Sequence, residues 1–255
     1  MFKRITVVAI VLVVISAGVW FRVDGKKPTT VAKSNSTSHT TTLSSDGFNK
    51  RQYSLTDPNS IWVIVNKQHP LQPISYAPTD LRYPSVPLRV PGLPEMQMRN
   101  VAATALEQMF AAANAVGLHL VVSTAYRSYS YQQTLYDGYV SSQGQAAADQ
   151  GSARPGFSEH QTGLAVDIRN SSDTCSLESC FGTTPEGEWL AANCYKYGFI
   201  LRYPADKETI TGYEYEPWHF RYVGTSLSNE MHKDRIETLE EFFGVSGGTT
   251  YKSTS

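Results

Sequence analysis

The stretch Ser158-Glu-His-Gln-Thr-Gly-Leu-Ala-Val-Asp167 decides the fold, because it combines a turn with the start of a strand that has two different faces. After Gly163, side chains of an extended chain alternate, which places Asp167 on the face opposite the apolar residues. A carboxylate in so apolar a strand is costly unless it is paired or binds a metal. His160 can fold back to meet Asp167, so the two form either a structural hydrogen bond or part of a metal site. The residues expected to face the core are Leu164, Val166 and Ile168.

A second stretch, Tyr213-Glu-Tyr-Glu-Pro-Trp-His-Phe-Arg-Tyr222, contains a histidine with carboxylates three and five residues before it. A catalytic zinc ion needs three nitrogen or oxygen ligands and an open position for water. It also needs a carboxylate base beside that water. We predict that His160, Asp167 and His219 hold the zinc and that Glu216 is the base.

The spacing of Glu216 and His219 conflicts with a regular strand, on which the two side chains would point to opposite faces. Pro217 cannot lie in a central ladder. We therefore expect a turn or bulge at Pro217 that brings Glu216 to the side of His219. Glu214 is the alternative base and has the same spacing problem.

An arginine lies in the stretch Tyr126-Arg-Ser-Tyr-Ser-Tyr-Gln132, where a predicted strand ends and a helix begins. In a cleft, Arg127 would stabilise an oxyanion or hold a substrate carboxylate. Taken alone, the same pattern fits a surface arginine equally well.

Three separated motifs together resemble the VanY-type D-alanyl-D-alanine carboxypeptidases, which are zinc peptidases of peptidoglycan. The similarity spans residues 60–225. The motifs are Tyr126-Arg127-Ser128-x-x-x-Gln132, Ser158-x-His160-x-x-Gly163-x-Ala165-x-Asp167 and Glu216-Pro-Trp-His219. The proline-rich arm that begins at Asn66-Lys67 also matches.

The resemblance implies zinc ligation by the two histidines and the aspartate named above. It implies that Glu216 activates water and protonates the leaving amine, and that Arg127 stabilises the tetrahedral intermediate. Gln132 and Ser158 would contact the substrate. The implied fold is a central antiparallel sheet flanked by helices, with the zinc site at a cleft of the sheet.

The implied substrates are peptidoglycan stem peptides, cleaved by a D,D-carboxypeptidase at the terminal D-Ala. An L,D-carboxypeptidase acting on tetrapeptide stems is the alternative within the enzyme class. A cell-wall binding module without catalysis, or a signalling domain that keeps zinc for structure, is the alternative from another class.

Hydrophobic periodicity and turn residues predict an α+β fold, because helices and strands do not alternate as regular βαβ units. Ser130 with Gln133 fits a capping box, and Thr184 with Pro185 fits a helix start. The prolines between residues 66 and 94 exclude regular structure there. Expected helices cover 95–116, 131–140 and 185–197, and expected strands cover 61–65, 119–123, 164–168, 199–203 and 218–223.

Composition fits one packed domain with extensions, because the 255 residues are 41% hydrophobic. The formal net charge is −1 and no basic stripe occurs, so nucleic acid is not an expected partner. We expect a monomer.

The N-terminal segment 1–27 contains Lys3-Arg4 followed by an apolar run to Phe21, which predicts a membrane anchor or a signal segment. The Ser/Thr-rich segment 28–52 predicts a disordered tether. The peptidase domain would then cover 53–245, and 246–255 would be a disordered tail. This arrangement places the catalytic domain outside the cytoplasm, anchored to the membrane or secreted if the segment is cleaved.

The three cysteines do not form a CxxC pair that could match a second one, which argues against a zinc–cysteine site. In an exported domain, Cys175 and Cys180 could form a small loop disulfide. Three reduced thiols are the alternative. Cys194 is expected to remain single, as a small core residue.

Overall fold

The computed structural model describes residues 47–253, so the predicted anchor and most of the predicted tether lie outside the described residues. A four-stranded antiparallel sheet with the order β3-β4-β6-β5 forms the centre. A two-stranded pair, β1 with β2, lies apart from it. The predicted α+β class with a central antiparallel sheet is confirmed. The strands are β1 Leu81–Arg82, β2 Met98–Arg99, β3 Leu120–Thr124, β4 Ala165–Asn170, β5 Phe199–Leu201 and β6 His219–Tyr222.

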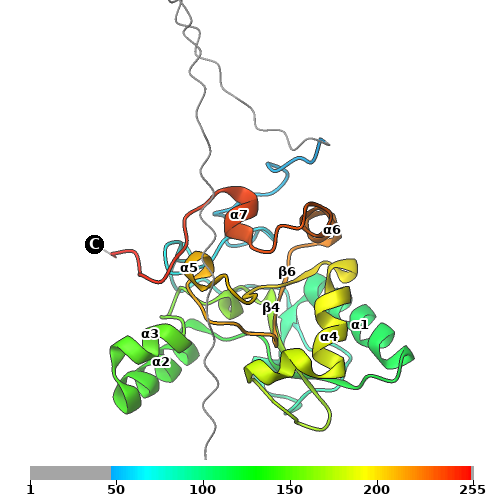
Figure 1. Cartoon of the computed structure of the whole chain (residues 1–255). Coiled ribbons are helices and arrows are strands. Elements are labelled where there is room, and N and C mark those ends of the chain that lie inside the picture. Colours follow the sequence, from blue (N-terminus) through cyan, green and yellow to red (C-terminus); the bar gives the residue numbers. More distant parts are fainter. Residues whose placement is uncertain (1–46, 254–255) are drawn as a thin grey trace, which may run out of the picture. The chain divides into compact units, whose positions relative to one another are not determined.

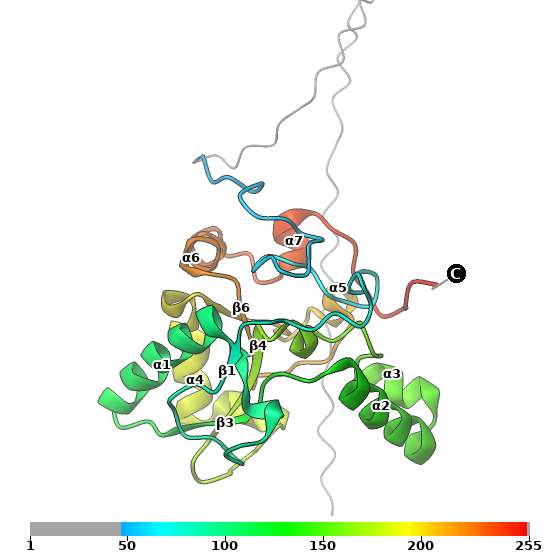
Figure 2. The same cartoon turned by 180° about the vertical axis from the view of Figure 1, so that it is seen from behind.

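Helices gather around this sheet in distinct groups. Figure 1 shows α1 and α4 on one side, the α2–α3 pair on the other, and α5 to α7 above, and Figure 2 shows the same from behind. The helices are α1 Asn100–Ala115, α2 Tyr129–Gln143, α3 Gln145–Gly151, α4 Pro185–Asn193, α5 Glu208–Thr211, α6 Thr225–Asp234 and α7 Leu239–Phe243.

The main core lies between the sheet and the helices α1 and α4. Val166 and Ile168 of β4 are fully buried there with Leu106 of α1 and Leu190 of α4. The predicted alternation along β4 is therefore confirmed: one face of the strand is apolar core. The opposite face is free to carry polar side chains.

The predicted helix 95–116 is shorter at its start, because residues 94–96 form a 3-10 turn and β2 precedes α1. Val101, in the first turn of α1, is 39% exposed. The helix ends as expected near Gly117, whose φ of 81° allows Leu118 N–H to donate to the carbonyl of Ala113.

Helix α2 begins earlier than predicted, and its N-cap is Ser128 rather than Ser130. The Ser128 hydroxyl accepts from the N–H of Tyr131. Gln133, the expected second half of a capping box, donates instead to Asp137. The predicted start of α4 is confirmed, because Thr184 accepts from Gly187 N–H.

The predicted strand 61–65 is wrong, although its side chains from Trp62 to Val65 are buried. The Arg221 guanidinium donates to the carbonyls of Ile61 and Val63. The indole of Trp62 donates to the carbonyl of Val223. The Arg221 side chain thus satisfies two carbonyls that a strand pair would have paired, and an apolar run alone does not reveal this.

Both boundary segments of the expected domain make defined contacts with it. Phe48, within the predicted tether, stacks on Trp62. At the other end, the Tyr251 ring packs against Phe157, and Lys252 N–H donates to the carbonyl of Lys67. Residues 246–253, for which disorder was expected, therefore lie on the domain. Across residues 47–253, no helix is long and apolar enough to span a membrane.

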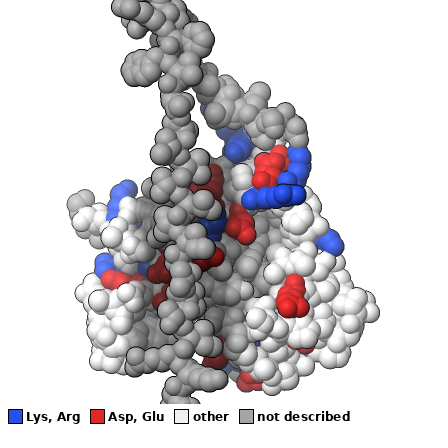
Figure 3. Space-filling view, in the orientation of Figure 1, with Lys and Arg blue, Asp and Glu red and all other residues white. Residues whose placement is uncertain are grey.

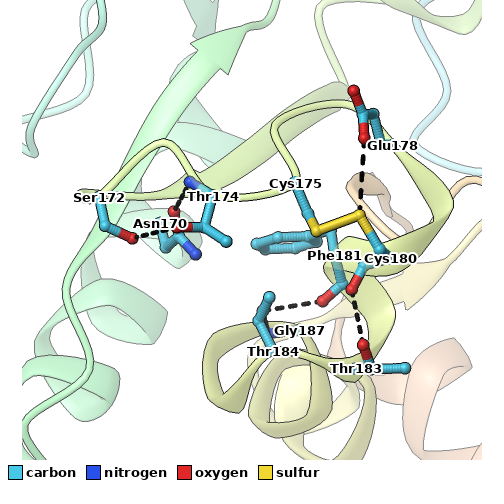
Figure 4. Close-up of a disulfide and its surroundings, with 10 residues drawn as sticks. All are labelled: Asn170, Ser172, Thr174, Cys175, Glu178, Cys180, Phe181, Thr183, Thr184 and Gly187. Atoms are coloured by element: carbon cyan, nitrogen blue, oxygen red, sulfur yellow. Dashed lines mark hydrogen bonds between the residues drawn. A yellow bond between two sulfur atoms is a disulfide. The ribbon is translucent and has the colours of Figure 1, made fainter.

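A disulfide joins Cys175 and Cys180 in the loop between β4 and α4, as predicted. Figure 4 shows the ring of Phe181 next to it, and Phe181 is fully buried. Cys194 is free and buried in the main core, which also matches the expectation. Burial raises the pKa of its thiol to about 12.

Candidate active site

A tight turn brings His160 over the sheet. Residues Glu159–Thr162 form a 3-10 helix that ends at Gly163, which has a left-handed φ of 68°. A Cβ at Gly163 would meet Leu81 Cδ2 at 2.9 Å, so position 163 needs glycine for space as well as for conformation. The reversal points the His160 imidazole back toward β4.

Strand register brings the other two predicted ligands together. Asp167 of β4 lies directly opposite His219 of β6. Their side chains leave the same face of the sheet, and Nδ1 of His219 is 3.2 Å from Oδ1 of Asp167. Nε2 of His160 is 3.4 Å from Oδ2 of Asp167. One ligand atom from each of the three residues falls within 4.8 Å of the others.

The free atoms of this group fit a metal ion. Nδ1 of His160 donates to the carbonyl of Ala125 at 2.5 Å, which leaves the Nε2 lone pair facing the centre. Within residues 47–253, His160 Nε2 and Asp167 Oδ1 are buried without a hydrogen-bond partner. Buried polar atoms of this kind are costly unless something binds them. Two imidazoles and one carboxylate match the ligand set of a catalytic zinc site.

The two histidines differ in protonation, and His160 is already in the form that a metal requires. Burial and the nearby Arg127 lower the pKa of His160 to about 4, so this imidazole is neutral at pH 7. Burial lowers the pKa of His219. The carboxylates of Asp167 and Glu159 raise it and outweigh burial, so the pKa is about 9. Metal binding at Nδ1 of His219 must therefore displace a proton.

Glu159 supports His219 from behind and was not predicted. Its Oε2 lies 3.6 Å from Nε2 of His219, on the side away from the proposed ligand atom. Its Oε1 accepts from Arg202 and Arg221, each at 2.8 Å. Arg202 also forms a two-pronged pair with Glu240. All four charged groups are buried. A carboxylate behind a ligating histidine orients the ring and increases its basicity.

A turn at Pro217 removes the conflict in spacing. His219 N–H donates to the carbonyl of Glu216, so β6 begins only at His219 and Glu216 precedes it in a turn. Oε2 of Glu216 lies 3.6 Å from Nδ1 of His219. Glu214 is exposed. The expectation of a turn here is confirmed, and Glu216 is the carboxylate placed to act as a base.

The environment of Glu216 favours its protonated form. Burial raises its pKa to about 7, with Asp167 adding to the effect, while His219 and Arg127 oppose it. A carboxylate with a pKa near neutrality can accept a proton and later return it.

Arg127 points into the same centre. One of its Nη atoms lies 3.8 Å from Oδ2 of Asp167. The other donates to the side-chain carbonyl of Gln132 at 3.1 Å. Gln132 is fully buried, and its amide donates to the carbonyl of Ala153. The structure therefore places Gln132 behind Arg127, where it holds the guanidinium, and its contact with the substrate stays a prediction.

These groups share one cleft of about 450 Å³. Ser158 is buried but lines the cleft, in keeping with its predicted contact with substrate. The cleft lies between the α2–α3 pair and the disulfide loop, which contributes Leu177 to its lining. The Cys175–Cys180 bridge thus helps to shape the rim.

Comparison with known proteins identifies the family. The model of the VanY family, D-alanyl-D-alanine carboxypeptidase, matches residues 95–225. The chain belongs to this family. The protein YodJ of Bacillus subtilis is 43% identical over 217 residues, which cover 83% of this chain and 79% of YodJ.

Two solved structures of VanY relatives extend the comparison. The LdcB LD-carboxypeptidase is 45% identical with a TM-score of 0.70, and the match covers 74% of this chain and 89% of LdcB. A mutant of the vancomycin resistance D,D-pentapeptidase VanY, solved in complex with Zn(II), is 34% identical with a TM-score of 0.57. That match covers 72% of this chain and 98% of the other. The protein is thus a zinc metallopeptidase of the carboxypeptidase type.

Proposed function

We propose that the protein hydrolyses the peptide bond before the C-terminal D-Ala of peptidoglycan stem peptides. One observation carries this proposal: the candidate ligands His160, Asp167 and His219 share a cleft with both Glu216 and Arg127. A binding module needs neither a base nor an oxyanion donor in that place.

Each residue has a defined task in such a reaction. When bound, zinc supplies a Lewis acid that makes water reactive near neutral pH. Glu216 accepts a proton from the attacking water and returns it to the nitrogen of the departing D-Ala. Arg127, held by Gln132, donates to the carbonyl oxygen as that oxygen gains negative charge.

Of the two bonds considered, the L,D bond of a tetrapeptide stem is the one that we propose as preferred. The similarity to the LdcB LD-carboxypeptidase supports this choice over the D,D bond expected from sequence. Cleavage of the D,D bond of a pentapeptide is the second candidate, supported by the description of the family.

We further propose that the domain works outside the cytoplasm as a monomer, held to the membrane through residues 1–27. The Cys175–Cys180 disulfide supports export, because disulfides persist in oxidising compartments. The apolar run near the N-terminus supports the anchor.

The test is to incubate the purified protein with defined tetrapeptide and pentapeptide stems and to identify the products by mass spectrometry, with and without a zinc chelator. We expect loss of one D-Ala from the tetrapeptide, at a higher kcat/KM than from the pentapeptide, and no product with chelator. A higher kcat/KM on the pentapeptide would replace the L,D assignment by the D,D one. No product from either stem with zinc present would refute the proposed function.

A further inference from the structure

Helix α2 carries a stripe of residues that neither the fold nor the proposed chemistry uses. These residues lie at helical spacing and line a shallow groove on the surface. We call this set the α2 stripe, and it consists of Tyr131, Thr134, Leu135, Gly138, Tyr139 and Ser142.

Most of the α2 stripe is exposed, and of its members Leu135 alone is half-buried. The buried residues of α2 are Gln132 and Tyr136, which lie on its other side. Tyr131 is 44% exposed and Tyr139 is 40% exposed. Neither tyrosine hydroxyl has a hydrogen-bond partner within residues 47–253. A single exposed tyrosine needs no explanation, but two on one stripe form a surface that can bind something.

Gly138, between the two tyrosines, has no explanation inside the molecule. A glycine within a helix costs about 1 kcal/mol relative to alanine. Yet a Cβ at this position would have no atom within 4 Å among the described residues beyond its own turn of the helix and its chain neighbours. Packing against the rest of the described chain does not require glycine here, and the absent side chain leaves the groove open at this point.

The groove continues into the catalytic cleft. Tyr131, Leu135 and Tyr139 line both. In Figure 3, the surface of the α2–α3 region at the lower left carries few charges. A ligand that extends out of the cleft over this wall would therefore meet aromatic faces and hydroxyl groups rather than charged side chains.

We propose that the α2 stripe binds an amino sugar of the glycan strand to which the stem peptide is attached. The inference rests on the proposed function, in which the C-terminal end of the stem lies at the metal centre. An extended tetrapeptide spans about 13 Å, and the stripe from Tyr131 to Ser142 is about 16 Å long. Because the groove shares Tyr131, Leu135 and Tyr139 with the cleft, a stem that runs along this wall would bring its sugar onto the stripe. Tyrosine offers an apolar ring face together with a polar hydroxyl, which matches the faces and hydroxyls of a sugar ring.

The experiment compares two substrates that differ only in the sugar. We would measure kcat/KM for a free tetrapeptide and for the same tetrapeptide linked to its N-acetylglucosamine–N-acetylmuramic acid disaccharide. For the wild type, we expect the disaccharide to raise kcat/KM about fivefold, as the gain of one aromatic contact allows. Gly138→Gln, which fills the groove, is expected to bring this ratio close to one.

Gly138→Ala is the second variant, and its expected effects on stability and on the substrate ratio have opposite signs. It should raise the Tm, because alanine favours a helix, while it lowers the substrate ratio. Asp137→Gln changes an exposed residue of the same helix beside the stripe and should keep the wild-type ratio. Tyr83→Ala removes a tyrosine that is equally exposed but lies outside the cleft, and it should also keep that ratio.

A wild-type ratio of one, or a ratio that both Gly138 variants retain, would overturn the inference. If the wild type cleaves neither substrate with zinc present, the proposed function fails instead. In that case, NMR line broadening of the free disaccharide with wild type and with Gly138→Gln decides the inference separately. Broadening that only the wild type causes supports the sugar site, and equal or absent broadening overturns it.

Discussion

The floor of the cleft and its α2 wall are built in opposite ways. The floor consists of β4, β6 and the 3-10 turn at residues 159–162, and its charged groups are buried and bonded on several sides. The wall is a helix of which only Gln132 and Tyr136 are buried. Catalysis requires groups with fixed geometry in a site shielded from water, whereas a surface that binds a long polymeric substrate can remain exposed.

The largest effect is expected when Glu216, the proposed base in the floor of the cleft, is replaced. We expect Glu216→Gln to lower kcat by about a thousandfold or more, because the other described carboxylates of the cleft lining, Asp167 and Glu159, serve as proposed metal ligand and as support of His219. Zinc content, measured by metal analysis, should stay near one per chain. Glu214→Gln is the control, because this exposed carboxylate should be dispensable. Substantial activity in Glu216→Gln would remove Glu216 from the mechanism.

Loss of the guanidinium is the next largest effect. Arg127→Ala should lower kcat by about 10²–10³, as expected for one oxyanion donor, in steady-state assays on the tetrapeptide. Arg51→Ala changes an exposed arginine far from the cleft and should have no effect. If Arg127→Ala raised KM and left kcat unchanged, Arg127 would bind the substrate without acting in the transition state.

The buried carboxylate behind His219 should determine how tightly the floor holds metal. We expect Glu159→Gln to weaken zinc binding about 10–100-fold, measured by competition with a chelator. Glu241→Gln, which changes a partly exposed pair with Lys207, is the matched control. Unchanged zinc affinity in Glu159→Gln would show that Glu159 serves only the packing of Arg202 and Arg221.

As the pH falls, the catalytic groups in the floor of the cleft should lose activity before the structure of the α2 wall is affected. Glu216 must be ionised to accept a proton, so kcat/KM should fall as pH drops through its pKa. Burial raises this pKa to about 7, and bound zinc lowers it again, which places the midpoint of the acid limb below about 7. A pH–rate profile that stays flat down to about pH 4, the ordinary value for a glutamate, would contradict this assignment.

The smallest effect is expected in the wall. Ser128→Ala removes the N-cap of α2 and should lower the free energy of unfolding by about 1 kcal/mol in urea titrations. Ser130→Ala is the control, because Ser130 does not cap the helix. Equal losses in both variants would contradict the assignment of the cap to Ser128.

Sequence reasoning placed the zinc ligands correctly in one cluster because their positions follow from local rules. Alternation along a strand and a glycine turn sufficed for His160 and Asp167, and a proline marked the turn at Glu216. Glu159 could not be found in this way. Its partners Arg202 and Arg221 lie 43 and 62 residues away, and an acidic residue whose partners are distant looks like a solvated one.

Contacts that the sequence alone does not show also explain the other differences between prediction and structure. The run 61–65 reads as a strand, but a distant arginine satisfies its carbonyls. Gln132 reads as a substrate contact, because a motif does not show which side of Arg127 it occupies. The C-terminal segment reads as disordered from its composition, although Tyr251 packs against Phe157 and backbone groups of the segment bond to residues distant in the sequence.

That attachment gives the end of the chain a part in holding the catalytic loop. Tyr251 accepts from the N–H of Arg154 and packs on Phe157, both in the segment that leads into Ser158 and His160. A protein that ends at residue 245 would therefore lack the Tyr251 contacts that hold the catalytic loop. A truncated protein should keep its sheet yet lose order at the loop that supplies the first metal ligand. A shortened protein for crystallisation or engineering should therefore keep Tyr251.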